Sequence, residues 1–173
     1  DVNMVALTGS IKAGQEVIMR SAEKLHRIVL ELGGKDPAIV LSDSDIGAAA
    51  KAIVSTSTMY TGQVCFGVER VYCDSSIYEE FVARCVEESL KLVVGDPLDE
   101  YTDIGPFAVQ FQFERVLEHI RDALEKGASL LCGGERVGFN GYFMQPGVMV
   151  NVNHNMKIMK EETFGPITPI MLF

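Results

Sequence analysis

The chain alternates between short apolar runs and longer stretches in which apolar residues recur every three or four positions. The apolar runs predict strands at residues 5–7, 28–30, 38–41, 68–73, 129–132 and 167–173, and an extended stretch at 142–150 after a turn at 138–141. The helical spacing predicts helices over residues 11–25, from Ile46 onward, after Ser76, and up to Gly127. Strands and helices that alternate in this way predict an α/β fold with a mainly parallel sheet flanked by helices.

The pattern also predicts how the helices begin and which faces they bury. Asp43 or Asp45 is placed to cap the helix that begins near Ile46, and Ser75 and Ser76 are placed to cap the next one. The residues expected on the buried faces are Ile77, Phe81, Cys85 and Ser89, with Val82, Val86 and Leu90 beside them, and, in the following helix, Phe113, Leu117, Ile120 and Leu124.

Composition sets the size of the fold and excludes several partners. With 173 residues, of which 47% are hydrophobic and 23% charged, the chain suits one folded domain and a piece of a second. Its net charge of −9 disfavours nucleic acid and anionic membranes as partners, and no apolar run approaches the roughly 20 residues that cross a bilayer. The first residues lack a signal-peptide pattern, so we expect a cytoplasmic protein. Apolar strands near both ends lead us to expect a fragment of a longer chain.

The cysteines are spaced in a way that argues against a metal centre. They form no CxxC pair, and the three histidines stand far from one another, so no metal site is expected. Cys85 lies on a predicted helix face, and Cys73 and Cys132 lie in predicted strands, which favours structural roles for these three. Cys65 is the exception, because it lies in a loop between glycines.

Two segments could supply a base and a nucleophile. Glu31 interrupts an apolar run just before Gly33 and Gly34, which places a carboxylate at the carboxyl end of a strand, where α/β sheets bind their ligands. A solvated glutamate at a strand end is the alternative, and the segment alone slightly favours it. Cys65, in residues 61–67, could be an exposed nucleophile. A buried free thiol is the commoner state of a cysteine.

Two further segments could contact a ligand. Residues 161–166 carry two carboxylates and an aromatic ring before Gly-Pro, which could hydrogen-bond a sugar and stack on a planar ring. They could equally form an acidic loop with its aromatic packed inward. Residues 8–10, Thr-Gly-Ser, lie at a strand-to-helix junction, where main-chain N–H groups suit a phosphate. Taken alone, residues 161–166 favour the ordinary loop, and residues 8–10 give a weak signal because they lack a full GxGxxG pattern.

Taken together, the four segments resemble the aldehyde dehydrogenase superfamily over essentially the whole chain. Residues 30–37, Leu-Glu-Leu-Gly-Gly-Lys-Asp-Pro, resemble the glutamate signature of that family. Residues 62–65, Gly-Gln-Val-Cys, resemble its cysteine signature, and residues 160–166, Lys-Glu-Glu-Thr-Phe-Gly-Pro, resemble its nicotinamide-side loop. The order and spacing of the segments also fit the family.

The resemblance implies a reaction and a role for each matched residue. The protein would oxidise an aldehyde to a carboxylic acid with NAD or NADP, and Glu31 would place it in the hydrolytic branch. Cys65 would attack the aldehyde, passing through a thiohemiacetal and a thioester, and its main-chain N–H would supply half of an oxyanion hole. Glu31 would activate the water that hydrolyses the thioester. The cofactor contacts implied by the resemblance are Gly9, Ser10, Leu32, Glu162 and Phe164.

The resemblance also implies a division of the chain. Residues 1–32 would be the carboxyl-terminal end of a Rossmann-like cofactor domain, and residues 33–173 most of the catalytic domain. An oxyanion-hole asparagine and the adenosine-binding part would lie before residue 1, so the 173 residues alone are expected to be inactive. The full-length protein is expected to be a homodimer or homotetramer. Phe66, Tyr60 and Thr58 depart from the family pattern near the substrate.

Two other functions stay open at this point. A cysteine-dependent ester or thioester hydrolase would pair Cys65 with His119 or His154, although neither histidine has a recognisable flanking signature. A non-catalytic fragment of a dehydrogenase would act only as a binding surface.

Overall fold

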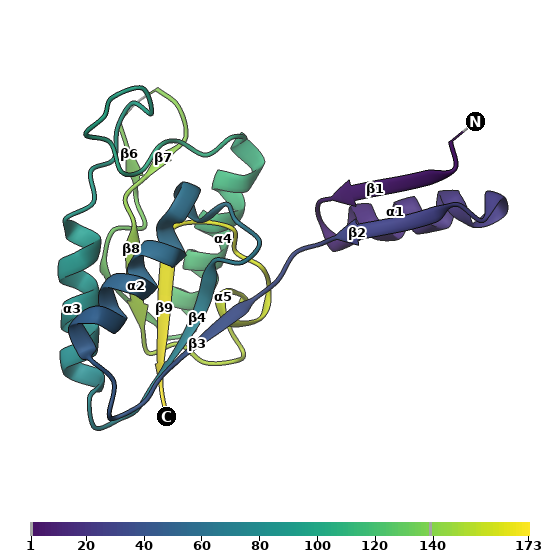
Figure 1. Ribbon diagram of the computed structural model, residues 1–173. Coiled ribbons are helices and arrows are strands. Elements are labelled where there is room, and N and C mark those ends of the chain that lie inside the picture. Colours follow the sequence, from purple (N-terminus) through teal and green to yellow (C-terminus); the bar gives the residue numbers. More distant parts are fainter. Residues whose placement is uncertain (1, 139) are drawn as a thin grey trace. The chain divides into compact units, whose positions relative to one another are not determined.

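A computed structural model describes residues 2–138 and 140–173 and has an α/β fold (Figure 1). The chain divides into two compact units, Asp1–Gly34 and Lys35–Phe173. We expected a border after residue 32, and the assignment of the two parts to a cofactor domain and a catalytic domain stays a prediction. The expected turn at residues 138–141 includes Phe139, which lies outside the described residues. Within the described ranges, no helix has both the length and the apolar character that crossing a membrane requires.

The smaller unit is a single β-α-β element. Its two strands pair in parallel, and its elements are β1 (Met4–Thr8), α1 (Ile11–Ser21), the short 3-10 helix η1 (Ala22–Lys24) and β2 (Arg27–Glu31). Ser10 begins α1, because its side-chain oxygen accepts a hydrogen bond from the N–H of Ala13 at 3.2 Å. The helical segment ends at Leu25, whose φ of 52° is left-handed.

A glycine allows α1 to lie close to β2. A Cβ at Gly14 would lie 2.9 Å from Cδ2 of Leu32 and 3.5 Å from Cδ1 of Leu30. The first distance is shorter than a normal carbon–carbon contact of about 3.5–4.0 Å. Any larger residue at position 14 would therefore require the Leu32 side chain to shift.

The larger unit is built on a five-stranded sheet with strand order β3-β4-β9-β8-β5 (Figure 1). Strands β3, β4, β9 and β8 pair in parallel with one another, and β5 pairs antiparallel with β8, so the expected mainly parallel sheet is confirmed. The strands are β3 (Asp36–Val40), β4 (Val68–Cys73), β5 (Ser129–Cys132), β8 (Gly147–Val150) and β9 (Ile167–Leu172), with a separate pair β6 (Arg136–Val137) and β7 (Phe143–Met144). The helices are α2 (Ile46–Thr58), η2 (Met59–Gly62), α3 (Tyr78–Leu90), α4 (Gln110–Glu125) and α5 (Lys157–Lys160).

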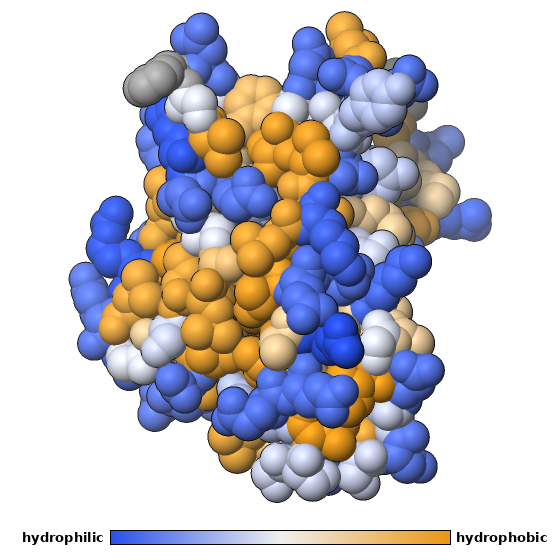
Figure 2. Space-filling model, turned by 90° about the vertical axis from the view of Figure 1, so that its left-hand side faces the viewer, coloured by the Kyte–Doolittle hydropathy of each residue, from blue (hydrophilic) through white to orange (hydrophobic). Residues whose placement is uncertain are grey.

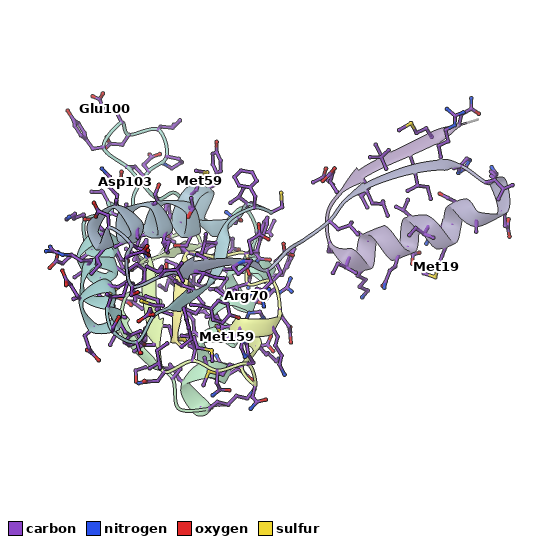
Figure 3. All side chains as sticks on the ribbon, turned by 60° about the horizontal axis from the view of Figure 1, so that its bottom comes forward. Met19, Met59, Arg70, Glu100, Asp103 and Met159 are labelled. Atoms are coloured by element: carbon purple, nitrogen blue, oxygen red, sulfur yellow. The ribbon has the colours of Figure 1, made fainter. Side chains whose placement is uncertain are left out.

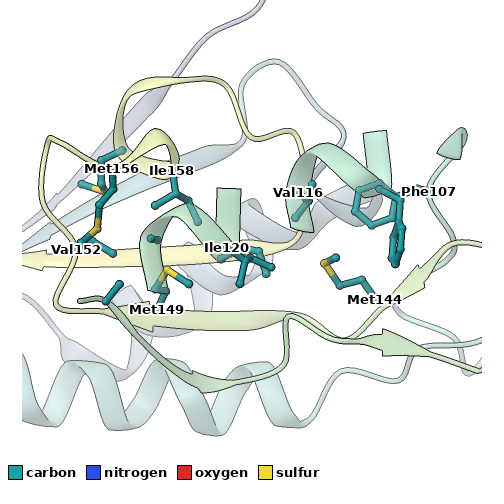
Figure 4. Close-up of a cluster of buried hydrophobic side chains, with 13 residues drawn as sticks. Phe107, Val116, Ile120, Met144, Met149, Val152, Met156 and Ile158 are labelled. Atoms are coloured by element: carbon teal, nitrogen blue, oxygen red, sulfur yellow. The ribbon is translucent and has the colours of Figure 1, made fainter. Parts of the chain in front are cut away.

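Alternate residues of the sheet point into two separate cores. In β8, Val148 and Val150 belong to the core under α2 and α3, whereas Met149 belongs to the core under α4 and α5. Figure 4 shows the second of these cores, in which Met149 lies with Val116 and Ile120 of α4. Because both faces of β8 are buried, its sequence is a continuous apolar run rather than an alternating one.

The helix starts agree with the sequence pattern in one case and not in the other. Asp45 caps α2 through its side chain, as expected. Ser75 and Ser76 do not cap α3, which begins after Ile77 without a side-chain cap, and that expectation was wrong. Instead, the N–H and the hydroxyl of Ser76 both bind Oδ1 of Asp74, at 2.8 and 2.6 Å. Asp74 and Ser76 thus form a local side-chain turn ahead of the helix, a type of turn that competes with helix capping.

The buried faces of α3 and α4 also differ in part from the expected rows. Leu90 and Leu124 are exposed, whereas Gln112 and His119 are buried with the apolar residues of α4. Figure 2 shows that apolar surface lies among hydrophilic residues on one side of the molecule, so an exposed leucine is ordinary. A buried glutamine and a buried histidine are not ordinary, and their partners are described next.

Candidate active site

Three segments of the larger unit meet at one end of its sheet, where three of its strands begin. Lys35 precedes β3, residues 61–67 lead into β4, and residues 161–166 precede β9. Since these three strands are neighbours and parallel, their amino ends lie at the same end of the sheet. Two of the four candidate segments from the sequence pattern are therefore close together in this unit.

The chain approaches the cysteine along a strained path. Tyr60, Thr61 and Gly62 have φ values of 50°, 63° and 70°, so three consecutive residues are left-handed. A Cβ at Gly62 would lie 2.2 Å from the carbonyl carbon of Gly165. The cysteine segment and the segment 161–166 therefore touch backbone to backbone, and only glycine permits this contact.

Two side chains hold this path in place. The hydroxyl of Thr61 donates a hydrogen bond to the carbonyl of Gly105 at 3.0 Å. Oε1 of Gln63 accepts a hydrogen bond from the N–H of Ala108 at 3.1 Å. Both partners lie in the chain between α3 and α4, so the main chain is anchored immediately before the turn that carries the cysteine.

Cys65 is exposed, whereas Cys73 and Cys85 are buried and Cys132 is half-buried. Burial raises the pKa of the Cys73 thiol to about 11 and that of Cys85 to about 12. Because the thiolate is the reactive form, these two cysteines are unreactive near neutral pH. Of the two readings left open for Cys65, the structure therefore supports an exposed thiol, and the catalytic role stays a prediction.

Two buried side chains from other elements hold the segment 161–166. Glu69, near the start of β4, accepts hydrogen bonds from the N–H of Thr163 at 2.8 Å and from the N–H of Phe164 at 2.7 Å. Nε2 of Gln112, in α4, donates to the carbonyls of Thr163 and Phe164 at 2.8 and 2.9 Å. All four main-chain polar groups of these two residues are thus bound to side chains.

A buried ion pair adjoins these contacts. Nζ of Lys35 lies 2.7 Å from Oε2 of Glu69 and donates to the Thr163 hydroxyl at 2.9 Å. Burial lowers the pKa of Lys35, and the charge of Glu69 acts in the opposite direction. Nδ1 of His119 lies 3.2 Å from the same hydroxyl, and burial, followed by the charge of Lys35, lowers the pKa of His119. Thr163 is therefore fixed through both its main chain and its side chain.

The two predicted cofactor contacts of this segment flank the fixed threonine. Glu162 and Phe164 are both half-buried, and Phe164 has a left-handed φ of 54°. Phe164 is therefore not packed fully inward, whereas the alternative of an ordinary acidic loop expected it to be. A half-buried ring and carboxylate on a fixed backbone can contact a planar ligand and its hydroxyl groups.

The predicted residues of the smaller unit lie where its strands end. Gly9 and Ser10 follow β1, Glu31 is the last residue of β2, and Leu32 comes after it. The N–H of Gly9 donates to the carbonyl of Glu31 at 3.0 Å, which ties the two strand ends together. Glu31 and Ser10 are exposed, and the first N–H groups of α1 point away from the helix, an arrangement that suits a phosphate. The predicted site residues thus form two groups, one in each unit.

A cavity of about 750 Å³ opens beside the cysteine segment of the larger unit. Its walls include Thr58, Tyr60, and the two residues Met59 and Asp103 that Figure 3 labels. Cys65 is not among the residues that line it. The departures from the family pattern at positions 58 and 60 therefore shape this cavity.

The histidines offer no support for a cysteine–histidine pair. His119 is only 1% exposed, and its ring nitrogens face the hydroxyl of Thr163 at 3.2 Å and a carboxylate oxygen of Glu161 at 3.7 Å. Nε2 of His154 lies 2.8 Å from the hydroxyl of Tyr72. Each histidine that the hydrolase reading required is thus bound to a partner other than the exposed thiol.

The sequence pattern did not single out Glu69 or Gln112, and it considered His119 only as a possible partner of Cys65. Glu69 interrupts an apolar strand in the same way as Glu31, and this signal could have found it. Gln112 and His119 lie in a helix with many polar residues, and nothing in the pattern separates them from the exposed ones. Only the fold shows that both face the segment before β9.

Comparison with known proteins gives matches over the whole chain. The aldehyde dehydrogenase family model matches residues 1–173. The lactaldehyde dehydrogenase of Escherichia coli is 41% identical over 174 residues, which covers 99% of this chain and 36% of that protein. The structure of the putative aldehyde dehydrogenase PutA from Anabaena variabilis has a TM-score of 0.95 and 43% identity, and the match covers 99% of this chain and 37% of that one. The structure of AldC from Pseudomonas syringae, complexed with NAD+ and octanal, has a TM-score of 0.94 and 34% identity, with 99% and 36% covered.

The chain spans about a third of the length of the relatives that it matches. Within that third, both the sequence and the fold agree with the family almost from end to end. The resemblance seen in the glutamate, cysteine and nicotinamide-side segments is therefore confirmed for the chain as a whole, and this chain belongs to the aldehyde dehydrogenase family.

Proposed function

We propose that the natural protein carrying this chain oxidises an aldehyde to a carboxylic acid with NAD or NADP, using Cys65 as the nucleophile and Glu31 as the hydrolytic base. One observation carries the proposal. Cys65 is the exposed cysteine among the four, and its turn follows a backbone that touches the segment of Glu162 and Phe164. An exposed thiol beside a fixed ligand-binding segment, in a chain of this family, fits a nucleophile better than a structural cysteine.

The chemistry assigned to the two residues balances. The Cys65 thiolate attacks the carbonyl carbon, which forms a C–S bond and an oxyanion that its own N–H can stabilise. The carbon then loses hydride with its electron pair, and the carbonyl reforms as a thioester. Glu31 takes a proton from the water that attacks the thioester, the C–S bond breaks, and the carboxylic acid leaves with the thiolate restored.

The residues present fit a dinucleotide, which supplies the two-electron acceptor when it is bound. In the smaller unit, Gly9 and Ser10 offer the start of α1 to a phosphate, and Leu32 offers apolar contact. In the larger unit, Glu162 offers a carboxylate to ribose hydroxyls, and Phe164 offers a ring to the nicotinamide. AldC from Pseudomonas syringae was solved with NAD+, and its fold over this span supports a dinucleotide here.

The location and the assembly of the protein are parts of the same proposal. A cytoplasmic location is supported by the relative named aldehyde dehydrogenase, cytosolic 1, of Rattus norvegicus, which is 42% identical over 175 residues. A homodimer or homotetramer is supported by β3, an edge strand of the sheet that exposes Ile39 at 66%.

Replacing Glu31 by glutamine in the natural protein tests the reaction. Glutamine keeps the size of the side chain but cannot take a proton from water at neutral pH. Rapid mixing with aldehyde and dinucleotide should give up to one equivalent of NAD(P)H per site, followed by turnover about 10²–10⁴-fold slower than in the wild type. Mass spectrometry should find the acyl group on Cys65.

Two controls complete this test. Glu23→Gln changes another exposed carboxylate of the smaller unit and should leave both phases unchanged. Cys65→Ala should abolish the burst as well as turnover. Full steady-state turnover by Glu31→Gln would show that Glu31 is only a solvated residue at a strand end.

A further inference from the structure

We propose that Glu69 and Gln112 are positioning residues, which hold the Thr163–Phe164 backbone so that Glu162 and Phe164 present their side chains to the dinucleotide. The inference rests on the proposed function, and it concerns residues that touch neither the substrate nor the cofactor. It follows from four hydrogen bonds and from the backbone conformation that they impose.

Glu69 is directed at the segment by an irregularity in its own strand. The pairing of β3 with β4 matches Asp36 to Val68 and then Pro37 to Arg70, so Glu69 is left out of the register. An extra residue of this kind, a β-bulge, re-aims a side chain. Here the carboxylate meets two successive N–H groups, those of Thr163 and Phe164, at 2.8 and 2.7 Å.

Gln112 supplies the hydrogen-bond donors, as Glu69 supplies the acceptors. Its side-chain nitrogen donates to both carbonyls of the same two residues, at 2.8 and 2.9 Å. Peptide groups in a loop normally bind water or one another. In this segment, two N–H groups and two carbonyls are instead bound by one carboxylate and one amide, which leaves the backbone a single conformation.

That conformation is one that Phe164 would not adopt by itself. A φ of 54° is unfavourable for an aromatic residue, and such conformations persist only where the surroundings over-determine them. Here the four hydrogen bonds from Glu69 and Gln112 hold Phe164 in this conformation. They set the direction of the Phe164 ring and of the neighbouring Glu162, which are the two side chains proposed to face the cofactor.

The ion pair with Lys35 makes the carboxylate possible at this depth. The side chains of Lys35 and Glu69 are only 9% and 8% exposed, and an unpaired charge at such a position is strongly unfavourable. A buried ion pair often adds no stability over apolar residues of the same size. The presence of this pair is better explained by the acceptor that it provides for Thr163 and Phe164.

Substituting each anchor in the natural protein tests the inference. Glu69→Gln puts an amide NH₂ where an N–H donor needs an acceptor, and Gln112→Met removes both donors at nearly constant volume. The dissociation constant for NAD(P), measured without aldehyde, should rise at least about tenfold, because the cofactor contacts are no longer pre-organised. The single-turnover rate of NAD(P)H formation should fall by about 10²-fold, the effect of a misplacement near 1 Å.

Further variants separate positioning from stability. Val71→Ala on the same strand removes buried apolar contacts without touching the segment, and it should leave the dissociation constant within about twofold of the wild type. Lys35→Met with Glu69→Gln removes both charges, so the melting temperature should recover towards that of the wild type while cofactor affinity does not. Hydrogen exchange at Thr163 and Phe164 should increase in the anchor variants alone.

The outcomes distinguish this inference from the proposed function. A wild-type protein that neither binds a dinucleotide nor reduces it overturns the proposed function, and the inference with it. If the wild type does both, and Glu69→Gln and Gln112→Met bind the dinucleotide like Val71→Ala, only the inference is overturned. Unchanged exchange at residues 163 and 164 in the anchor variants would also overturn it.

Discussion

The two units place their candidate residues at opposite ends of parallel strands. In the smaller unit, Gly9, Ser10, Glu31 and Leu32 lie at or just beyond the carboxyl ends of β1 and β2. In the larger unit, Cys65 and the segment 161–166 lie just before the amino ends of β4 and β9. Open α/β sheets usually bind their ligands at the carboxyl ends. The smaller unit follows that rule, and the larger one does not.

The difference teaches how each unit fixes its residues. At the carboxyl ends, a strand runs directly into a turn or helix, so a cap such as Ser10 and one main-chain hydrogen bond from Gly9 suffice. At the amino ends, loops arrive from a distance and need partners from elsewhere in the chain. Glu69, Gln112 and the Gly62–Gly165 contact are those partners. Substitutions should therefore disturb the larger unit's site through its supports and the smaller unit's site only locally.

The largest expected effect is a difference in reaction rate between the exposed thiol of Cys65 and the buried thiols of the core. Cys65 should react with iodoacetamide at least about 10²-fold faster than Cys73 or Cys85, because burial raises the pKa of those two to about 11 and 12 and shields them from the reagent. Peptide mapping of the labelled natural protein over time measures the rates. Labelling of Cys73 or Cys132 before Cys65, with activity retained, would show that the exposed turn does not carry the reactive group.

The next effect compares one glycine from each unit. Gly62→Ala should lower the free energy of unfolding by about 2–4 kcal/mol, because its φ of 70° and its contact with Gly165 both exclude a side chain. Gly9→Ala should change it by less than about 0.5 kcal/mol, since its nearest neighbour would lie at an ordinary 3.7 Å. Urea denaturation of the natural protein gives both values.

Gly127→Ala is the matched control for backbone conformation. Its φ of 97° is also positive, but nothing lies within 4 Å of the added Cβ. It should cost about 1–2 kcal/mol, which is the conformational part alone. Equal losses for positions 62 and 127 would mean that the contact with Gly165 contributes nothing.

The smallest effect is a dependence of stability on pH in the larger unit. The pKa of folded His119 lies below its ordinary value of 6.5, because of burial and the charge of Lys35, with Arg115 adding to this and Glu161 and Glu118 opposing it. The unfolded chain therefore binds more protons below about pH 6.5, and stability is lost as pH falls through this window. The slope attributable to His119 should be at most about 1.4 kcal/mol per pH unit.

A substitution isolates that slope from the other titrating groups. His119→Gln should be less steep than the wild type between pH 7 and 5, whatever its absolute stability. Glu161→Gln removes a group that favours the charged histidine, so its slope should extend to lower pH. Parallel wild-type and His119→Gln curves would contradict the assignment.

The sequence predicted the larger features of the fold and the residues of the family signatures. The strands and the parallel sheet followed from apolar runs, because burial on both faces leaves no polar position in a strand such as β8. The exposure of Cys65 did not follow, since a thiol between glycines can be buried or exposed. The left-handed path through Tyr60 and Thr61 was also out of reach, because neither residue type favours it and its anchor, the hydrogen bond from Thr61 to Gly105, spans 44 positions.

The supports of the site show why the rest could not be predicted. Glu69 and Thr163 are separated by 94 positions, so their hydrogen bond has no local signature. Gln112 reaches Thr163 across 51 positions, from a helix whose expected buried face was apolar. Ser76 is of a residue type that often caps helices, but its hydroxyl donates to Asp74 in a local turn, and α3 begins only after Ile77.

The grip on the Thr163–Phe164 backbone has a consequence for how this segment can diversify. Glu69 and Gln112 bind peptide groups, which every residue type shares, except that proline lacks the N–H. The side chain at position 164 can therefore be exchanged, for example by Phe164→Leu, while the loop keeps its path. The backbone conformation of this segment thus depends on distant residues, Glu69 and Gln112. The side chain that the segment offers to a ligand depends only on the residue at position 164.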